Sequence, residues 1–368
     1  MRIRRKYGTS GDENYYSELY ENTVYIREGM TGDYGRDKRD GDTPLLRNIK
    51  TGEKIFLRRL SLRPDERGAY LQRVLEPPRA DGLLWPVDLI RLDGGADESC
   101  HLFVDHEYAP IRTPSELLPG GYAVAMPVLN ADVIPGDIKF NQIRPSRWTE
   151  KNIQTLAVRL AGILDQLNSA GYDCNDLHPS RLIFPPSGRV LLDYSHLICP
   201  RKIPSGVPGV SADAGSFLRT PRNHNYSLDF ADPAVIQGLV PIPDRQSQNY
   251  TLAALLFYLF FNRGPYDGGL FAGYPDNTPH NHEIRMEYIS RLPVFIFEPG
   301  DDSNAPGAFA EDDEIITLWA ECPEILKSLF LRALPRTNAE RRGKNTARPE
   351  PLEWLAAFRS LGWDRASE

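Results

Sequence analysis

The feature that most constrains the fold of this chain is the run LAALLFYLFF at residues 252–261, which is apolar on every side of a helix. A helix that spans a bilayer needs about 20 apolar residues, so this run is too short to cross a membrane. A helix of this kind is stable where the rest of the chain covers it. We therefore expect a buried helix, and at 368 residues the chain is long enough for one large two-lobed domain or two ordinary ones.

The composition is that of a soluble globular protein, with 41% hydrophobic and 25% charged residues. The formal net charge of -7 argues against a general nucleic-acid binder, which normally has a basic face. The opening MRIRRK is a small basic cluster that we interpret as a solvated tail. No apolar stretch follows it, so we do not expect a secretory signal. The cysteines form no Cys-x-x-Cys pair, so we expect no disulfides, no zinc site and a cytoplasmic location (Cys100, Cys174, Cys199, Cys322).

The first 130 residues predict strands with a single helix. Residues 1–20 are polar and rich in tyrosine, and we expect an irregular lead-in there. The stretch TPLLRNIKTGEKIFLRRL predicts a hairpin over residues 43–60, with its turn at Thr-Gly. RPDERGAYLQRVLE predicts a helix over residues 63–76 that ends before two prolines. Further strands are expected at 83–92, 100–108 and 121–129.

From residue 149 the period of the apolar residues becomes helical. TEKNIQTLAVRLAGILDQLNSAG predicts a helix that closes at Gly171. Short strands are expected at RLIF and RVLLD, and a long Pro/Gly/Ser-rich segment at 198–230 is over-long for a simple connection. Later helices are expected at 247–262, 314–334 and 350–360, with a loop over 263–312.

These elements predict an α+β fold of two lobes. The small N-lobe, residues 21–128, is β-rich with one helix, and the larger C-lobe, residues 129–363, is mostly helical. A segment near 126–132 joins the two lobes. Ligands commonly bind at such a seam, so we expect the functional site there.

Two aspartates follow apolar runs in the expected C-lobe. Asp176 comes after the helix of 149–171, and Asp193 closes the strand RVLLD. Phosphoryl transfer depends mainly on positioning and on neutralising charge. It uses one carboxylate to orient a hydroxyl, a second to hold magnesium and a cation to hold the phosphates. The two aspartates are therefore candidates for such a site. His178, close to Asp176 in the chain, could act as a base there or be an ordinary polar loop residue.

The stretch CNDLHPSR resembles the catalytic loop of protein kinases, which reads His-Arg-Asp with Asn five residues on. Asp193-Tyr194-Ser195 is similar to the Asp-Phe-Gly that follows in kinases. Other segments occur in kinase order, and together they cover roughly residues 45–363: KTGEKIFLRRL for the second and third strands, FADPAVIQG for Ala-Pro-Glu, NYTLAALLFYLFFNRGPYDG for the central helix, and RPEPLEWLAAFRSLGW for the closing helix. The resemblance implies a protein-kinase-like fold, with 198–230 as the activation segment.

The stretches LLWPVDLI, GYAVAMPVL and the variant GPYDG are similar to those of a narrower bacterial group of kinase-like proteins. Members of that group are often encoded beside a von Willebrand A-type protein and a metal-dependent phosphatase, as in tellurite-resistance-type clusters. The resemblance thus implies a protein partner of one of these two kinds.

The resemblance also implies roles for individual residues, with ATP and Mg²⁺ as cofactors. Asp176 would orient the hydroxyl and Asp193 would hold the metal. Arg58 stands at the position of the strand lysine, with Glu66 as its helix partner and Glu76 as the alternative. Met126 and Val128 would contact nucleotide at the hinge, and the glycine-rich loop would be REGMTGDYGRDKR, with Gly29, Gly32 and Gly35.

Several positions depart from the kinase pattern. Arg58 keeps the charge of lysine, but its planar fork is not equivalent to an ammonium at a crowded phosphate. Arg181 replaces the asparagine ligand, and a guanidinium has donors but no acceptor with which to bind a metal. Tyr194-Ser195 replaces Phe-Gly and so removes the freedom of glycine.

Four further positions belong to the frame around the site. The glutamate of Ala-Pro-Glu is Ala234, which would leave Arg341 and Arg342 as orphaned partners. Gln248 stands where the central helix usually carries an aspartate that braces the catalytic loop.

Three hypotheses about function follow. The first is a pseudokinase or regulatory and scaffolding protein in bacterial signalling that acts by protein contact and can bind nucleotide. The second is an active, atypical Ser/Thr kinase in which Asp176 and Asp193 work while Arg58 and Arg181 neutralise phosphate charge. The third is a kinase-fold protein-binding module whose cleft is filled by side chains such as Arg181 and Tyr194. The fold by itself does not decide among them.

Overall fold

The computed structural model describes most of the chain in segments. The described residues are 14–17, 24–30, 44–60, 77–91, 122–127, 134–135, 149–174, 177, 182–184, 191–193, 198–200, 230–236, 244–271, 274, 278–291, 293–307, 312–335 and 347–363. Contacts divide the chain into two units, the first of Met1–Pro77, Leu84–Pro135 and Pro204–Ala214, and the second of Pro78–Leu83, Gly136–Ile203 and Gly215–Glu368. The protein is a mixed α and β structure with a small curled sheet.

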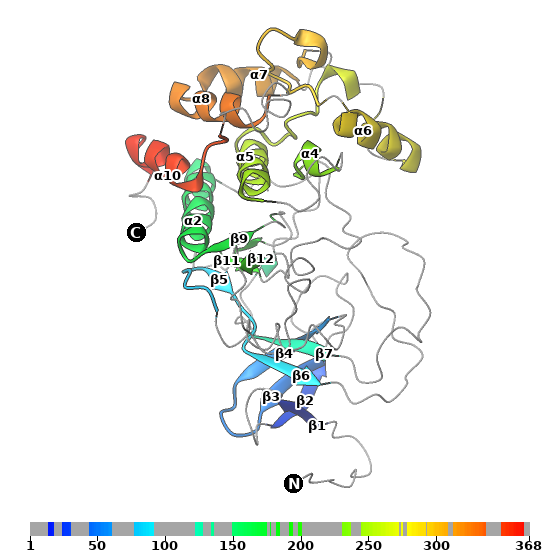
Figure 1. Cartoon of the computed structure of the whole chain (residues 1–368), viewed down its shortest axis with the longest axis vertical. Coiled ribbons are helices and arrows are strands. Elements are labelled where there is room, and N and C mark those ends of the chain that lie inside the picture. Colours follow the sequence, from blue (N-terminus) through cyan, green and yellow to red (C-terminus); the bar gives the residue numbers. More distant parts are fainter. Residues whose placement is uncertain are drawn as a thin grey trace. The chain divides into compact units, whose positions relative to one another are not determined.

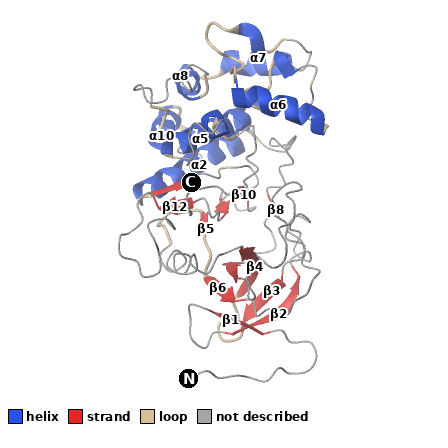
Figure 2. Ribbon diagram, turned by 45° about the vertical axis from the view of Figure 1, so that its right-hand side comes forward, coloured by secondary structure: helices blue, strands red, loops and turns tan. Residues whose placement is uncertain are grey.

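Six of the described strands, all in the first unit, form the curled sheet (Figure 2). It closes into a barrel in the order β1-β2-β3-β4-β7-β6, and every pairing of these neighbours is antiparallel. The strands are β1 (Asn14–Ser17), β2 (Val24–Met30), β3 (Pro44–Asn48), β4 (Lys54–Leu60), β6 (Asp88–Arg91) and β7 (Tyr122–Pro127). A short strand, β8, spans Ile134–Pro135.

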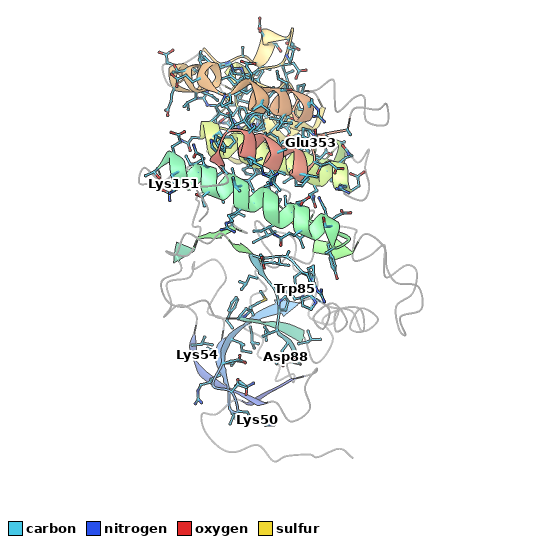
Figure 3. The ribbon with its side chains drawn as sticks, turned by 90° about the vertical axis from the view of Figure 1, so that its left-hand side faces the viewer. Lys50, Lys54, Trp85, Asp88, Lys151 and Glu353 are labelled. Atoms are coloured by element: carbon cyan, nitrogen blue, oxygen red, sulfur yellow. The ribbon has the colours of Figure 1, made fainter. Side chains whose placement is uncertain are left out.

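The hairpin of β3 and β4 confirms the sequence-based prediction. Its turn carries Lys50 and leads into Lys54 (Figure 3). Asn48 accepts hydrogen bonds from the backbone N–H groups of Lys50 and Thr51 at 2.9 and 3.2 Å. Gly52 has a φ of 75°, a conformation that glycine adopts without a steric cost.

Alternating residues of the strands build the core of the barrel. Leu46, opposite Ile55, and Leu57, opposite Ala125, belong to one buried cluster that also includes Ile90. Because side chains of a strand alternate between faces, residues two apart share this core. The intervening residues are covered as well (Leu45, Phe56, Leu89 and Met126).

The second unit is mostly helical in its described part. Its strands are β9 (Tyr172–Cys174), β10 (Leu182–Phe184), β11 (Leu191–Asp193) and β12 (Ile198–Pro200), and β5 (Leu83–Leu84) lies at the boundary of the two units. Its α-helices are α2 (Glu150–Ser169), α4 (Pro233–Ile236), α5 (Arg245–Phe261), α6 (Pro279–Arg291), α7 (Asp312–Glu321), α8 (Glu324–Ala333) and α10 (Pro351–Ser360). Two 3₁₀ turns are η6 (Gly269–Phe271) and η7 (Asp302–Asn304).

Helix α5 is the buried helix that the apolar run predicts. Residues Leu252 to Phe257 are all fully covered, and α2, α7 and α8 contact this helix. Figure 1 shows α2, α5 and α10 side by side in the second unit. Aromatic rings fill the space between α5 and its neighbours. The centroid of the Phe257 ring lies 5.4 Å from that of Phe330 and 5.3 Å from that of Phe295. No helix among the described residues is long and apolar enough to cross a membrane.

Local signals set the ends of α2 as predicted. Thr149 caps the first turn by accepting from the backbone N–H of Asn152, whose side chain accepts in return from the N–H of Thr149. Gly171 follows the helix with a φ of 84°, so the chain can turn directly into β9. The prediction of a helix from 149 to 171 is therefore confirmed.

Three predictions about local structure differ from the structure. Asn14–Ser17 forms β1, within the segment expected to be irregular, because it pairs with both β2 and β6. The expected loop of 263–312 contains α6, where the Thr278 hydroxyl accepts from the backbone N–H of Asn281 at 3.2 Å. The single helix expected over 314–334 is two helices, α7 and α8, and it breaks at Pro323 because proline disfavours a helical conformation in the preceding residue.

The other predicted helices agree with the structure more closely. Helix α5 begins at Arg245, two residues before the predicted start, because Asp244 and Ser247 form a reciprocal cap. Helix α10 spans Pro351–Ser360, as predicted. The helix expected at 63–76 and the strand at 100–108 lie outside the described residues.

Candidate functional site

The sequence-predicted site residues fall partly within the described chain. Arg58 lies on β4 with its backbone opposite Val124, and Asp193 is the last residue of β11. Gly29 lies on β2 opposite Leu45, beside a register shift, rather than in a loop. The remaining predicted residues lie outside the described residues (Glu66, Val128, Asp176, Arg181, Gly32 and Gly35).

Met126, which the resemblance placed at a hinge, is fully buried on β7, where it lies opposite Phe56. Its neighbours leave few backbone groups for a ligand, because the carbonyl of Ala125 accepts from the N–H of Val87 at 2.9 Å and Pro127 has no N–H. Protein atoms therefore already cover the Met126 side chain in this structure.

Strand β9 leads directly toward Asp176 and is held on one edge by β12. Cys174 lies opposite Ile198, and Asp173 lies opposite Cys199. Opposed residues share a face of a sheet, so Cys174 and Cys199 are on different faces. Cys174 is buried and forms no disulfide.

A buried side chain of α5 braces the end of β9. The side-chain Oε1 of Gln248 accepts a hydrogen bond from the backbone N–H of Cys174 at 2.7 Å. Gln248 is fully buried, so this bond is shielded from water. Gln248 thus holds the backbone of β9 through an uncharged amide.

Two buried residues bracket Asp176 along the chain. Cys174 is fully buried and Leu177 is 2% exposed. Both of these flanking residues are therefore packed into the second unit.

The strand that ends at Asp193 belongs to a short hairpin. Leu182 of β10 lies opposite Leu192 of β11, and both side chains are fully buried. The Leu192 N–H donates to the carbonyl of Gly82 at 2.7 Å. Packing and backbone bonds thus hold the residue that directly precedes Asp193.

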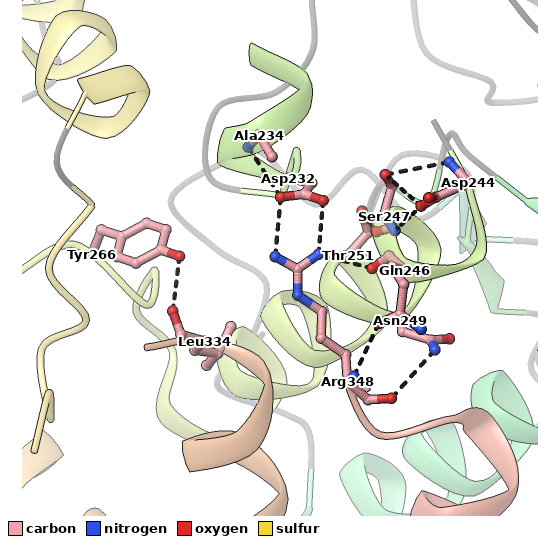
Figure 4. Close-up of polar contacts among 10 residues, drawn as sticks. All are labelled: Asp232, Ala234, Asp244, Gln246, Ser247, Asn249, Thr251, Tyr266, Leu334 and Arg348. Atoms are coloured by element: carbon pink, nitrogen blue, oxygen red, sulfur yellow. Dashed lines mark hydrogen bonds and ion pairs between the residues drawn. The ribbon is translucent and has the colours of Figure 1, made fainter. Parts of the chain in front are cut away.

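A buried ion pair holds the chain just before α4 (Figure 4). The Arg348 guanidinium donates to both carboxylate oxygens of Asp232, at 2.7 and 3.1 Å. The two side chains are 4% and 0% exposed. Asp232 also accepts from the N–H of Ala234 at 3.1 Å, so one carboxylate joins the start of α4 to the segment before α10.

Helix α5 completes the surroundings of this pair. Arg348 donates to the carbonyl of Gln246 at 2.9 Å, and the Arg348 carbon Cζ lies 4.9 Å from the centre of the Tyr250 ring. Burial by itself would lower the pKa of the Arg348 guanidinium, but the charge of Asp232 outweighs it and the pKa is raised. For the neighbouring Tyr250 and Tyr266, burial acts in the opposite direction and raises the pKa, because it disfavours the charged phenolate. The Arg348 guanidinium is therefore charged at neutral pH.

The Asp232–Arg348 pair joins two of the segments that were quoted for the resemblance, FADPAVIQG and RPEPLEWLAAFRSLGW. The sequence-based predictions include neither residue of this pair, and Ala234, two residues after Asp232, carries no acid. Arg341 and Arg342 lie outside the described residues. The signal that sequence reasoning missed is the aspartate of FADPAVIQG together with the arginine that opens RPEPLEWL.

An exposed ion pair in the same unit provides a contrast. Arg332 of α8 donates to both carboxylate oxygens of Glu353 of α10, which Figure 3 labels, at 2.6 and 3.3 Å. The hydrogen bond from Arg332 lowers the pKa of Glu353 below its ordinary value of 4.5.

A lowered carboxylate pKa means that this pair stabilises the folded state above about pH 4.5 and that the contribution is lost as the pH falls through the folded-state pKa. We expect Arg332→Ala to raise the pKa of Glu353, as measured by an NMR titration of its side-chain carboxyl. Because the pair is exposed, the free energy of unfolding at neutral pH should fall by less than about 1 kcal/mol. An unchanged Glu353 pKa would contradict this assignment.

The described residues contain no group of three or more His, Cys, Asp or Glu side chains placed to hold a metal ion. The carboxylates of Asp176 and Asp193 are not among those side chains, because Asp176 is not described and Asp193 is described only in its backbone. Neither a family model nor a curated protein matches this chain.

Proposed function

We propose that this chain is a protein-kinase-like protein with degraded motifs that acts mainly by protein contact, with nucleotide as a regulatory ligand. The observation that carries the proposal is a contrast between the backbone that leads to Asp176, which buried contacts hold, and the residue expected to bind the metal, which cannot do so. The lead-in to Asp176 is braced by the buried Gln248 bond at 2.7 Å. Arg181, by contrast, stands where a metal ligand is expected and has no acceptor.

The buried pair of Asp232 and Arg348 supports the same proposal. It fixes the chain immediately after the long Pro/Gly/Ser-rich segment of 198–230, while the pairing of β12 with β9 fixes the first three residues of that segment. A segment of this length between two fixed ends is suited to contact with another protein. On the resemblance, we propose a von Willebrand A-type protein or a metal-dependent phosphatase as that partner.

The second candidate is an active, atypical kinase, and the retention of both aspartates favours it. Asp193 ends a strand whose preceding residue is buried, and Asp176 lies between two buried neighbours. In this alternative Asp176 orients a Ser/Thr hydroxyl, Asp193 holds one Mg²⁺, and Arg58 and Arg181 neutralise phosphate charge.

One experiment separates the two candidates. Thermal stability is measured with ATP, with and without Mg²⁺, and transfer of the γ-phosphate to a general protein substrate is then assayed for the wild type and for Asp176→Ala and Asp193→Ala. The matched control is Asp313→Ala, which removes an exposed aspartate of α7. We expect stabilisation by ATP without transfer.

Transfer that both site variants abolish and Asp313→Ala preserves would overturn the pseudokinase proposal in favour of the active enzyme. No stabilisation at millimolar ATP would exclude both nucleotide-dependent candidates and leave the protein-binding module. Co-purification with the two partner classes then tests the proposed contact.

A further inference from the structure

The last turn of α2 contributes a second buried amide to the brace at β9. The Nε2 of Gln248 donates to the side-chain Oδ1 of Asn168 at 3.1 Å. Asn168 is 5% exposed and lies two residues before the C-cap of α2. Its own backbone carbonyl accepts from the N–H of Gly171 at 3.1 Å. Asn168 therefore bonds to α5 through its side chain and to the turn that leads into β9 through its backbone.

The direction of these hydrogen bonds follows from one fixed group. A backbone N–H can only donate, so the Gln248 side chain must present its oxygen to Cys174. The amide nitrogen of Gln248 is then directed at Asn168, which must present its own oxygen. Without an acceptor at 168, a rotation of the Gln248 amide by half a turn would place its NH₂ group against the Cys174 N–H, where no hydrogen bond can form.

We propose that Asn168 is a positioning residue for the end of β9, because it holds the Gln248 amide in the orientation that binds Cys174. The hydrogen bonds from Gln248 to Asn168 and from Cys174 to Gln248 form a relay that joins α2, α5 and β9. Asn168 and Gln248 are 80 residues apart in the chain, and Gln248 and Cys174 are 74 residues apart. The relay holds the chain two residues before Asp176 and uses no ionisable group of its own. The importance of this position for nucleotide chemistry rests on the proposed function, whereas the relay itself does not.

The test is amide hydrogen exchange of the intact protein, with Cys174 as the reporter and Leu334, whose N–H bonds Phe330 in α8, as the reference. Asn168→Leu should speed exchange at Cys174 by about tenfold relative to Leu334. Asn168→Asp keeps the acceptor and should restore most of the protection. Gln154→Leu, which removes another amide of α2, should leave Cys174 unchanged.

The Gln248→Glu background makes the test specific for orientation. A carboxylate presents an oxygen in either orientation, so Asn168→Leu should no longer affect exchange at Cys174 in that background. An equal effect in both backgrounds would overturn the proposal in favour of a purely structural role, as would unchanged exchange in Asn168→Leu. If the leucine variant does not fold, Asn168→Ala gives the same comparison.

Binding of magnesium–ATP separates the inference from the proposed function. If both hold, Asn168→Leu weakens the stabilisation by ATP while Gln154→Leu does not. If ATP fails to stabilise the wild type, the proposed function is overturned, and the exchange at Cys174 still decides the role of Asn168.

Discussion

Replacing Arg348 with alanine should lower the free energy of unfolding by about 3–5 kcal/mol, as measured by denaturant unfolding. The reason is that Asp232 is 0% exposed, so the substitution leaves a carboxylate in the interior without its bidentate partner. The guanidinium would also be lost from the Tyr250 ring and from the Gln246 carbonyl. We expect the helices that meet at this site, α4 and α5, to lose protection from hydrogen exchange first.

The matched control is Arg332→Ala, which also removes a bidentate arginine from a carboxylate. That pair is 45% and 41% exposed, and its loss should cost less than about 1 kcal/mol. A double variant with Asp232→Ala and Arg348→Ala removes both charges of the buried pair. Its loss in free energy of unfolding should be smaller than the sum of the losses in the two single variants. Equal costs for Arg348→Ala and Arg332→Ala would contradict the interpretation of the Asp232 pair as a buried anchor.

Replacing Gly268 with alanine should destabilise the protein by about 3 kcal/mol through overpacking. A Cβ atom at this position would lie 1.9 Å from the backbone oxygen of Asn304, which is far inside van der Waals contact. Asn304 cannot move aside easily, because its fully buried side chain donates to the carbonyls of Tyr266 and Val294 at 2.9 and 2.8 Å. It also accepts from the N–H of Leu270 at 3.1 Å.

The control for this substitution is Gly162→Ala in the middle of α2. No atom lies within 4 Å of a Cβ built there, and the residue is helical, so alanine should stabilise the protein by about 1 kcal/mol. The two glycine variants are compared by thermal unfolding followed by circular dichroism. A Gly268→Ala protein as stable as the wild type would show that η6 and η7 can separate at little cost.

Much of the candidate site depended on contacts that no local pattern contains. The position of Gln248 followed from the resemblance, but its pairing with Asn168 did not, because 80 residues separate the two in the chain. Asp232 went unrecognised because the glutamate was expected at 234, where alanine stands. Arg181 and Asp176, to which the proposed function assigns roles, lie outside the described residues, so these roles stay predictions.

The sequence by itself determined the elements whose signals are local. Helix α2 follows from its apolar period, the Thr149 cap and Gly171, and α10 follows from Pro351 at its first turn. The β3–β4 hairpin follows from two strand-like runs and Gly52, and the all-apolar α5 had to be the buried helix. Each of these signals acts through residues within a few positions of one another, and a single sequence displays them directly.

Only the tertiary structure decided which distant groups meet. It paired Arg348 with Asp232 across 116 residues and directed the Gln248 amide at both β9 and α2. It also brought Asn14–Ser17 into the barrel as a strand, although that polar segment carries no strand pattern of its own. The physical reason is that a buried polar group must find a partner, and the packing of the whole chain determines which partner comes within reach.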